Sequence, residues 1–396
     1  MRHNGPFVQF RGVGRGSYAL FMFHKLINNS SKITCLFVLS GLALIASFCE
    51  RAEAASTPEE KAMDAVMKTI HDYGRGHKGV LASGAATKPN EADEVYSARI
   101  GKLVAQEDFS QLEKIAQQDR AEKGRLLGAV WKLQAFYEGA ATPVGKKLTN
   151  ADYGSQISKM KKWVTAYPDS TTARLALAYG YLYFASFARG AEYADKVSDS
   201  QWGDYKSCTA QAEKVLLEAS SLKEQDPSWY YGMLMVAHNE GWDKARFREL
   251  FDQAVAFEPN FYHYYRAYAN YIMPQWYGEP GELMEFAEEV SGKLPEPNSS
   301  ITYFQIMSSF ACYCQESMRE LPKIDYPKYR QGYKNLTRLF GASNLNANRF
   351  GFVAAMFKDQ EGAHEAFADI SMMDSEIWYT QQIYDAASAW ASALPQ

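Results

Sequence analysis

The segment from residue 226 to residue 259 reads DPSWYYGMLMVAHNEGWDKARFRELFDQAVAFEP, and its pattern decides the fold. It contains two runs of helix-forming residues, Ser228–His238 and Lys244–Phe257, separated by a short polar turn and bounded by prolines. Bulky residues recur along the chain at intervals of 35 residues, namely Leu216, Phe251 and Phe286. A period near 34 residues is typical of stacked helical hairpins, which bury their apolar faces only against neighbouring hairpins.

Helical patterns extend over most of the remaining sequence. Apolar residues recur at helical spacing, proline and glycine separate the runs, and no segment shows the alternation of a half-buried strand. The expected helices include one that starts at Ser56-Thr57-Pro58 and ends near Tyr73, and others over 126–137, 171–189, 301–318 and 375–394. We therefore predict an all-α fold, a superhelical solenoid of tetratricopeptide-like (TPR-like) hairpins. Met235 and Glu289 occupy positions where that pattern favours small residues, so the repeats are degenerate.

The first part of the chain has the layout of a secretory signal. Lys25 and Lys32 precede an apolar run from Cys35 to Phe48, and Ala52-Glu53-Ala54 forms a small-x-small cleavage site. We interpret residues 1–54 as a targeting segment cleaved near Ala54, with Met22 as a candidate translation start. An uncleaved membrane anchor is the alternative interpretation.

Residues 55–90 are then an N-terminal helix with a glycine-rich linker, and residues 91–396 are the repeat domain. The expected location of the mature chain is secreted or periplasmic, and we expect no stable membrane span in it. The secretory layout carries this expectation.

The charge distribution argues against nucleic-acid binding. The whole chain carries a net charge of −4, and the targeting segment is basic, so the mature chain is the more acidic part. No basic block follows residue 54, whereas binding to a phosphate backbone needs one. We expect a neutral or basic protein or peptide partner instead.

Cysteine usage does not predict a disulfide framework or a zinc site. Cys208, Cys312 and Cys314 remain after cleavage, an odd number without a nearby histidine pair. We interpret them as buried small hydrophobic residues, and a single bridge from Cys208 to Cys312 or Cys314 is the alternative.

The middle of the chain resembles a bacterial TPR-like domain family of the domain-of-unknown-function class. The residues that carry the resemblance are Arg189-Gly190, Trp202, Asp226-Pro227-x-Trp229, Trp242, Ala254-x-x-x-x-Pro259, Tyr262-x-x-Tyr265, Pro274-x-Trp276-x-Gly278 and Phe286-Ala287. A looser similarity extends from about Ala98 to Trp390. The resemblance implies an α/α repeat fold and an exported or membrane-linked setting, and it implies no activity or catalytic residues.

Two aromatic segments supply the first candidate binding residues. In the segment 273–278, proline and glycine bracket Trp276 and Tyr277, which could form a platform for a sugar ring or a peptide proline. Their structural interpretation is that they fill the end of a hairpin. Arg266 lies in a tyrosine-rich helix, where it either satisfies tyrosine oxygens and stacks on a ring or binds a ligand.

The other candidates lie at helix ends. Arg189 precedes a glycine at the end of its helix, where a cation complements the helix dipole. His238 and Trp242 flank a hairpin turn, and a lone histidine at such a turn is more often a structural group than a base. No catalytic, phosphate-loop or metal-ligand motif is present, so we predict no catalytic residues, metal or cofactor.

Two functions are compatible with this sequence. The first is a scaffold in the cell envelope that binds a protein or peptide without catalysis, because stacked hairpins present a long concave surface. The second is an enzyme that acts on carbohydrate or peptidoglycan, with two carboxylates placed among aromatic rings.

Overall fold

The computed structural model describes residues 57–77, 79, 89–192, 194–312 and 315–393. Within these residues every regular element is a helix, which confirms the all-α prediction. The expected targeting segment 1–54 lies outside the described residues, as does most of the expected glycine-rich linker. No described helix is long and apolar enough to cross a membrane.

The helices of the first half of the chain mostly begin at side-chain caps. They are α1 Pro58–Tyr73, α2 Asp93–Ala105, α3 Phe109–Glu122, α4 Lys132–Ala141, α5 Asn150–Ala166, α6 Thr171–Arg189, α7 Asp199–Ala219, α8 Pro227–Glu240 and α9 Lys244–Phe257. Thr57 caps α1, with its hydroxyl accepting from the Glu60 N–H and the Glu60 carboxylate accepting from the Thr57 N–H. This capping box explains why the first predicted helix starts where the sequence indicates.

The second half of the chain has shorter helices. They are α10 Tyr262–Tyr271, α11 Glu282–Gly292, α12 Asn298–Met307, α13 Gln315–Glu320, α14 Tyr326–Phe340, α15 Asn344–Met356, α16 Gln360–Asp369, α17 Ser375–Trp378 and α18 Gln381–Ser392. Four 3-10 turns connect helices: η1 Leu127–Ala129, η2 Ala194–Lys196, η3 Ser308–Phe310 and η4 Leu321–Lys323.

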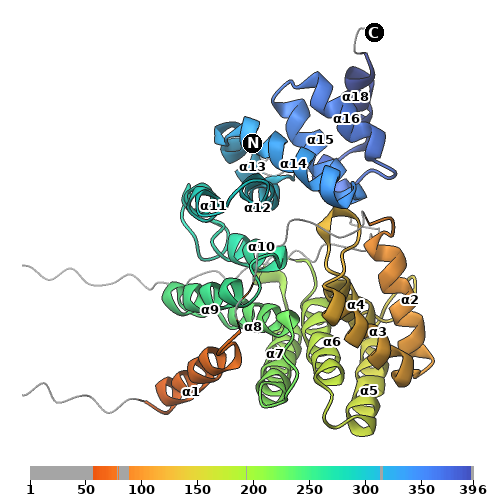
Figure 1. The fold of residues 1–396 in the computed structure, drawn as a ribbon, viewed down its shortest axis with the longest axis vertical. Coiled ribbons are helices and arrows are strands. Elements are labelled where there is room, and N and C mark those ends of the chain that lie inside the picture. Colours follow the sequence, from red (N-terminus) through yellow and green to blue (C-terminus); the bar gives the residue numbers. More distant parts are fainter. Residues whose placement is uncertain (1–56, 78, 80–88, 193, 313–314, 394–396) are drawn as a thin grey trace, which may run out of the picture.

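The central helices stack so that alternate helices touch. Each helix from α5 to α10 packs against the next, and α4, α6, α8, α10 and α12 also pack in a row, which we call the inner row (Figure 1). The residues of the 35-residue repeat lie on α7, α9 and α11 and are buried, as the repeat predicts. The Phe251 and Phe286 rings pack at 5.4 Å between centroids. Neighbouring units therefore share their apolar faces.

Elements next to the two ends of the row meet: η1 precedes α4, and α14 packs against α12. The turn η1 packs against α14, and Figure 1 shows the C-terminal helices beside the loop between α3 and α4. The Gly128 N–H donates to the Gly341 carbonyl over 3.1 Å, and the Asn346 side-chain amide donates to the Gly128 carbonyl over 3.3 Å. These contacts join segments more than two hundred residues apart in sequence.

Three predicted helices are interrupted. The segment 126–137 begins with η1, because Gly128 adopts a left-handed φ of +70°, and α4 starts only at Lys132. The segment 301–318 breaks after η3, and the segment 375–394 breaks at Tyr379, which has a φ of +62°. Left-handed backbone cannot continue an α-helix.

The cysteine interpretation is correct in one case and wrong in another. Cys208 is a free, buried cysteine on α7, so it forms no bridge. Burial raises the pKa of its thiol to about 11, which makes it unreactive. Cys312 is disulfide-bonded rather than a buried hydrophobic residue, and Cys314 lies outside the described residues.

Candidate functional site

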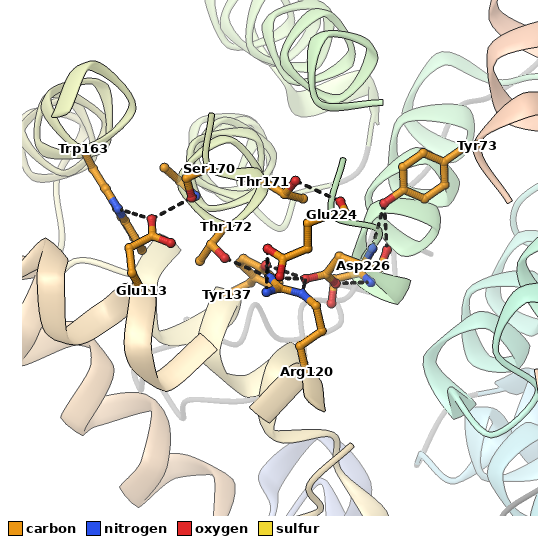
Figure 2. Close-up of polar contacts among 12 residues, drawn as sticks. Tyr73, Glu113, Arg120, Tyr137, Trp163, Ser170, Thr171, Thr172, Glu224 and Asp226 are labelled. Carbon is orange, nitrogen blue, oxygen red and sulfur yellow. Dashed lines mark hydrogen bonds and ion pairs between the residues drawn. The ribbon is translucent and has the colours of Figure 1, made fainter. Parts of the chain in front are cut away.

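A buried polar network joins the N-terminal helices to the start of α8. Asp226 is fully buried, and its carboxylate accepts from Arg120 over 2.8 Å and from the Tyr137 hydroxyl over 2.7 Å (Figure 2). The Tyr73 hydroxyl of α1 accepts from the Asp226 N–H over 2.8 Å. Although burial lowers the pKa of Arg120, the charge of Asp226 raises it overall. This guanidinium therefore stays charged and paired.

Glu113 extends the same set of contacts at the far end of α3. Its carboxylate accepts from Trp163 Nε1 over 2.8 Å and from the Ser170 hydroxyl over 2.6 Å (Figure 2). Thr172 accepts from Arg120 over 2.9 Å. Because these charged groups already have protein partners, the network is built to hold helices together rather than to bind a ligand.

A different set of polar side chains lies on the inner row and on α15, and two of its buried nitrogen atoms have no hydrogen-bond partner among the described residues. We call it the inner charged cluster, and its members are Glu138, Tyr183, Tyr231, His263, Arg266 and Arg349. Tyr183 is buried and the other five are half-buried, so most of the set retains contact with solvent.

Glu138 forms the acidic part of the cluster. It accepts from the Gln134 amide over 3.2 Å and from the Tyr183 hydroxyl. Burial raises the pKa of this carboxyl, and the positive charge of Arg266 partly opposes the rise. The charges of α4 and α10 therefore interact, although no ion pair forms between them within the described residues.

Arg266 and Arg349 form the basic part. Within the described residues neither guanidinium makes a salt bridge or a hydrogen bond, and Nη1 of Arg349 is buried without a partner. Burial and the charge of Arg266 lower the pKa of Arg349 to about 9. Two like charges thus lie close enough to repel each other without a direct counter-ion.

His263 lies next to these arginines and is neutral. Its ring packs at 5.1 Å from Phe261 and 5.4 Å from Tyr231, and no described residue forms a hydrogen bond with its buried Nδ1. Burial, followed by the charges of Arg266 and Arg125, lowers its pKa to about 3. At neutral pH it can offer one N–H donor and one acceptor to a ligand.

Asp93 and Glu94 at the start of α2 add carboxylates near Glu138. Burial, followed by the negative charges of Glu94 and Glu138, raises the pKa of Asp93 to about 7. Asp93 and Glu94 also share a side-chain hydrogen bond. A carboxyl with a pKa near 7 can donate or accept a proton at neutral pH.

Of the six binding residues that the sequence predicts, only Arg266 belongs to this cluster. The other five lie at the C-terminal ends of α6 and α8, in the turn after α8 and in the segment after α10. His238 packs edge-on against Trp276 at 4.8 Å and Tyr277 at 5.8 Å, and burial lowers its pKa to about 3. Trp242 is buried and donates from Nε1 to Glu240 over 3.0 Å.

Tyr277 and Arg189 also make contacts within the protein that explain their positions, as His238 does. Tyr277 stacks on Tyr271 at 4.7 Å and donates to the His238 carbonyl over 3.3 Å. Arg189 donates to the Gly190 and Glu192 carbonyls and lies 5.2 Å from the Trp202 ring. These contacts favour the structural interpretation, in which the rings fill the ends of the hairpins.

Sequence reasoning missed Glu138, Tyr183, Tyr231, His263 and Arg349 as site residues. The sequence did contain a feature that could have indicated Arg349 as a site residue. This arginine is the single charged residue of α15, and its neighbours in that helix are apolar and amide side chains. Nothing in the sequence spacing relates α4 or α15 to α10.

Known proteins give no further guide to the site. Comparisons of the chain with protein-family models, with curated proteins and with solved structures find no match. Among the described residues no group of three or more His, Cys, Asp or Glu side chains could hold a metal ion.

Proposed function

We propose that this chain is a TPR-like helical-repeat scaffold that binds a protein or peptide partner on its inner row. The observation that supports the proposal is the inner charged cluster. Within the part of the chain that the structure describes, His263 Nδ1 and Arg349 Nη1 are buried without partners, and Arg266 makes no salt bridge. The cluster draws on α4, α6, α8, α10 and α15, so a ligand bound there would contact several units at once.

The physical argument concerns the cost of unpaired charge. A guanidinium withdrawn from water without a counter-ion destabilises the fold, and natural proteins retain such groups mainly where they act on a ligand. The paired network around Asp226 shows that this chain satisfies buried arginines where only stability is required. The contrast points to a binding role for the inner charged cluster.

A photo-crosslinking experiment tests the scaffold. A benzoylphenylalanine in place of Tyr231, on the inner row, is compared with one in place of exposed Asp252 on α9. We expect the first variant to capture a partner from a cell-envelope extract and the second to capture none. Equal capture by both, or none by either from folded protein, would contradict the proposal.

Export to the cell envelope is part of the proposal and rests on the layout of residues 1–54. Fractionation of cells that express the whole chain, followed by N-terminal sequencing, tests it. We expect a periplasmic or secreted chain that starts near Ala55. A cytoplasmic chain with an intact N-terminus would exclude export.

An enzyme that acts on carbohydrate is the second candidate, and the raised pKa of Asp93 favours it. Asp93 and Glu138 interact electrostatically near Tyr183, as an acid pair beside an aromatic ring would. Asp93→Asn and Glu138→Gln would then lower hydrolysis of peptidoglycan fragments by about 100-fold or more. Glu249→Gln, on an exposed position of α9, is the control. A wild-type chain that hydrolyses none of the fragments excludes this candidate.

A further inference from the structure

We propose that Arg266 and Arg349 together bind a carboxylate of an acidic peptide on the inner row. This inference rests on the proposed scaffold function and names the chemistry of its ligand. It replaces the expectation of a neutral or basic partner, which was based on the net charge of the chain. The local charge of the inner charged cluster decides the ligand instead.

The two arginines stand on firmly held helices. Both α10 and α15 pack against η3, which therefore fixes their relative position. On α15, Phe350 stacks on Tyr333 of α14 at 4.1 Å between ring centroids. On α10, the Tyr264 hydroxyl donates to the Pro227 carbonyl over 2.6 Å. A binding site built on such helices is preorganised, because little order remains to be gained when the ligand arrives.

The guanidinium donors are free for an external acceptor. The carboxylates that act electrostatically on Arg349 are Asp374 and Glu376, and the one that Arg266 acts on is Glu138. Within the described residues none of these three comes within salt-bridge distance of either arginine. A ligand carboxylate can therefore take the parallel N–H donors of a guanidinium without displacing a protein partner.

The surroundings favour a peptide carboxylate over a free phosphate. Asp93, Glu94 and Glu138 lie on the acidic side of the cluster and repel a doubly charged ion more than a singly charged one. Burial raises the pKa of Tyr231 on α8, and Arg266 lies close enough for its charge to oppose the rise, while Ala267 follows Arg266 on α10. Both Tyr231 and Ala267 are half-buried and offer contacts to apolar side chains. An acidic peptide with apolar residues matches both features.

Fluorescence anisotropy tests the inference with a labelled, end-blocked hexapeptide that carries a single aspartate among leucine and serine residues. We expect saturable binding to the wild-type chain, and binding about 10-fold or more weaker for the asparagine counterpart, because a charge-assisted hydrogen bond is lost. Arg266→Gln and Arg349→Gln should each weaken binding to the same degree. Arg246→Gln on α9, which removes an arginine already paired with Asp243, should leave binding unchanged.

The outcomes separate this inference from the proposed function. Equal binding of both peptides, no binding of the acidic peptide, or no effect of the two arginine substitutions would overturn it. Displacement of the peptide by equimolar inorganic phosphate would also overturn it, since the site would then serve a small free anion. Crosslinking at Tyr231 without acidic-peptide binding would leave the scaffold standing and refute this inference alone.

A ligand-free measurement provides a second check. If the arginines are held for a ligand, Arg349→Met should raise the melting temperature of the free chain by about 2 °C or more, because it removes an uncompensated charge. Arg266→Met should do the same. A fall in melting temperature for both variants would show that the arginines support the fold, which would overturn the inference.

Discussion

Asp226 and Arg349 show two ways in which this chain buries charge. Asp226 has no exposure to solvent, and its carboxylate and backbone are bonded to groups from three helices. Arg349 is half-buried, and its buried Nη1 has no hydrogen-bond partner within the described residues. At the scale of single residues, removing the first should therefore destabilise the fold, whereas neutralising the second should not.

Asp226→Ala should destabilise the chain strongly. The substitution leaves Arg120 with the partly exposed Glu224 as its ion-pair partner and removes the cap that accepts from the Ser228 N–H. Breaking a buried ion pair in this way costs about 3–5 kcal/mol. Urea unfolding measures the difference, with Asp252→Ala as the control, because its exposed pair with Arg248 should contribute about 1 kcal/mol or less. Similar losses in both variants would show that the network around Asp226 is not a structural centre.

His238 should make the fold sensitive to acid. Its pKa is about 3 in the folded chain and about 6.5 when unfolded, so the unfolded state binds the extra proton between these values. The contribution of His238 to the free energy of unfolding is therefore fully present above pH 6.5. It is lost as the pH falls toward 3, and the loss at pH 4 is about 3 kcal/mol. His238→Gln should make this dependence about half as steep in denaturant unfolding at several pH values, because His263 has a similarly lowered pKa and contributes the rest. His71→Gln, at an exposed position, should leave the dependence unchanged, and an unchanged dependence in His238→Gln would disprove the assignment.

At the scale of helices, the distance between neighbouring helix backbones determines which glycines can be replaced by a larger residue. A Cβ on Gly139 of α4 would meet the backbone of Ser97 on α2, with the Ser97 Cα at 2.8 Å. A Cβ on Gly154 of α5 would meet nothing within 4 Å. Both glycines are helical, so their difference arises from packing between elements.

Alanine substitutions at these two glycines should have opposite effects. Gly139→Ala should destabilise the chain by about 1–3 kcal/mol, because backbone atoms must move apart. Gly154→Ala should stabilise it by roughly 0.5–1 kcal/mol through the better helix propensity of alanine. Chemical unfolding of the pair gives both signs in one experiment, and a stabilising Gly139→Ala would refute the close α2–α4 contact.

At the scale of the whole molecule, the contact between η1 and the α14–α15 region determines whether the row of helices closes. Gly128 is central to it, because its left-handed backbone allows bonds to Gly341 and Asn346 at once. A Cβ there would also meet the Ser343 side chain, with the Ser343 Cβ at 2.7 Å. The contact brings α15, and with it Arg349, back toward the inner row.

Gly128→Ala should loosen this closure. We expect faster hydrogen exchange at the amide of residue 128 and a larger radius of gyration in solution scattering, because left-handed backbone and the lack of space both disfavour alanine. Binding of the acidic peptide should weaken as well. Gly203→Ala on α7, where a Cβ meets nothing within 4 Å, is the control. An unchanged radius and exchange rate would show that closure does not depend on this turn.

The sequence by itself determined the helices and much of their order. The 35-residue spacing correctly placed Leu216, Phe251 and Phe286 on buried faces, and the cap at Thr57 correctly marked the start of the first helix. These features are local, since a cap or an apolar stripe needs only neighbours within a few residues. Breaks such as Gly128 and Tyr379 escaped prediction because their left-handed backbone depends on contacts made elsewhere.

Only the tertiary structure decided which charged residues meet. Arg266 was noted in the sequence, but its relation to Glu138 and Arg349 depends on the curvature of the helical row and on the return of α15 toward α10. Pairings between residues so far apart arise from the summed angles of many helix contacts, which no local pattern encodes. Burial also decided the roles of His238 and Tyr277, because packing and solvent access are properties of the assembled fold.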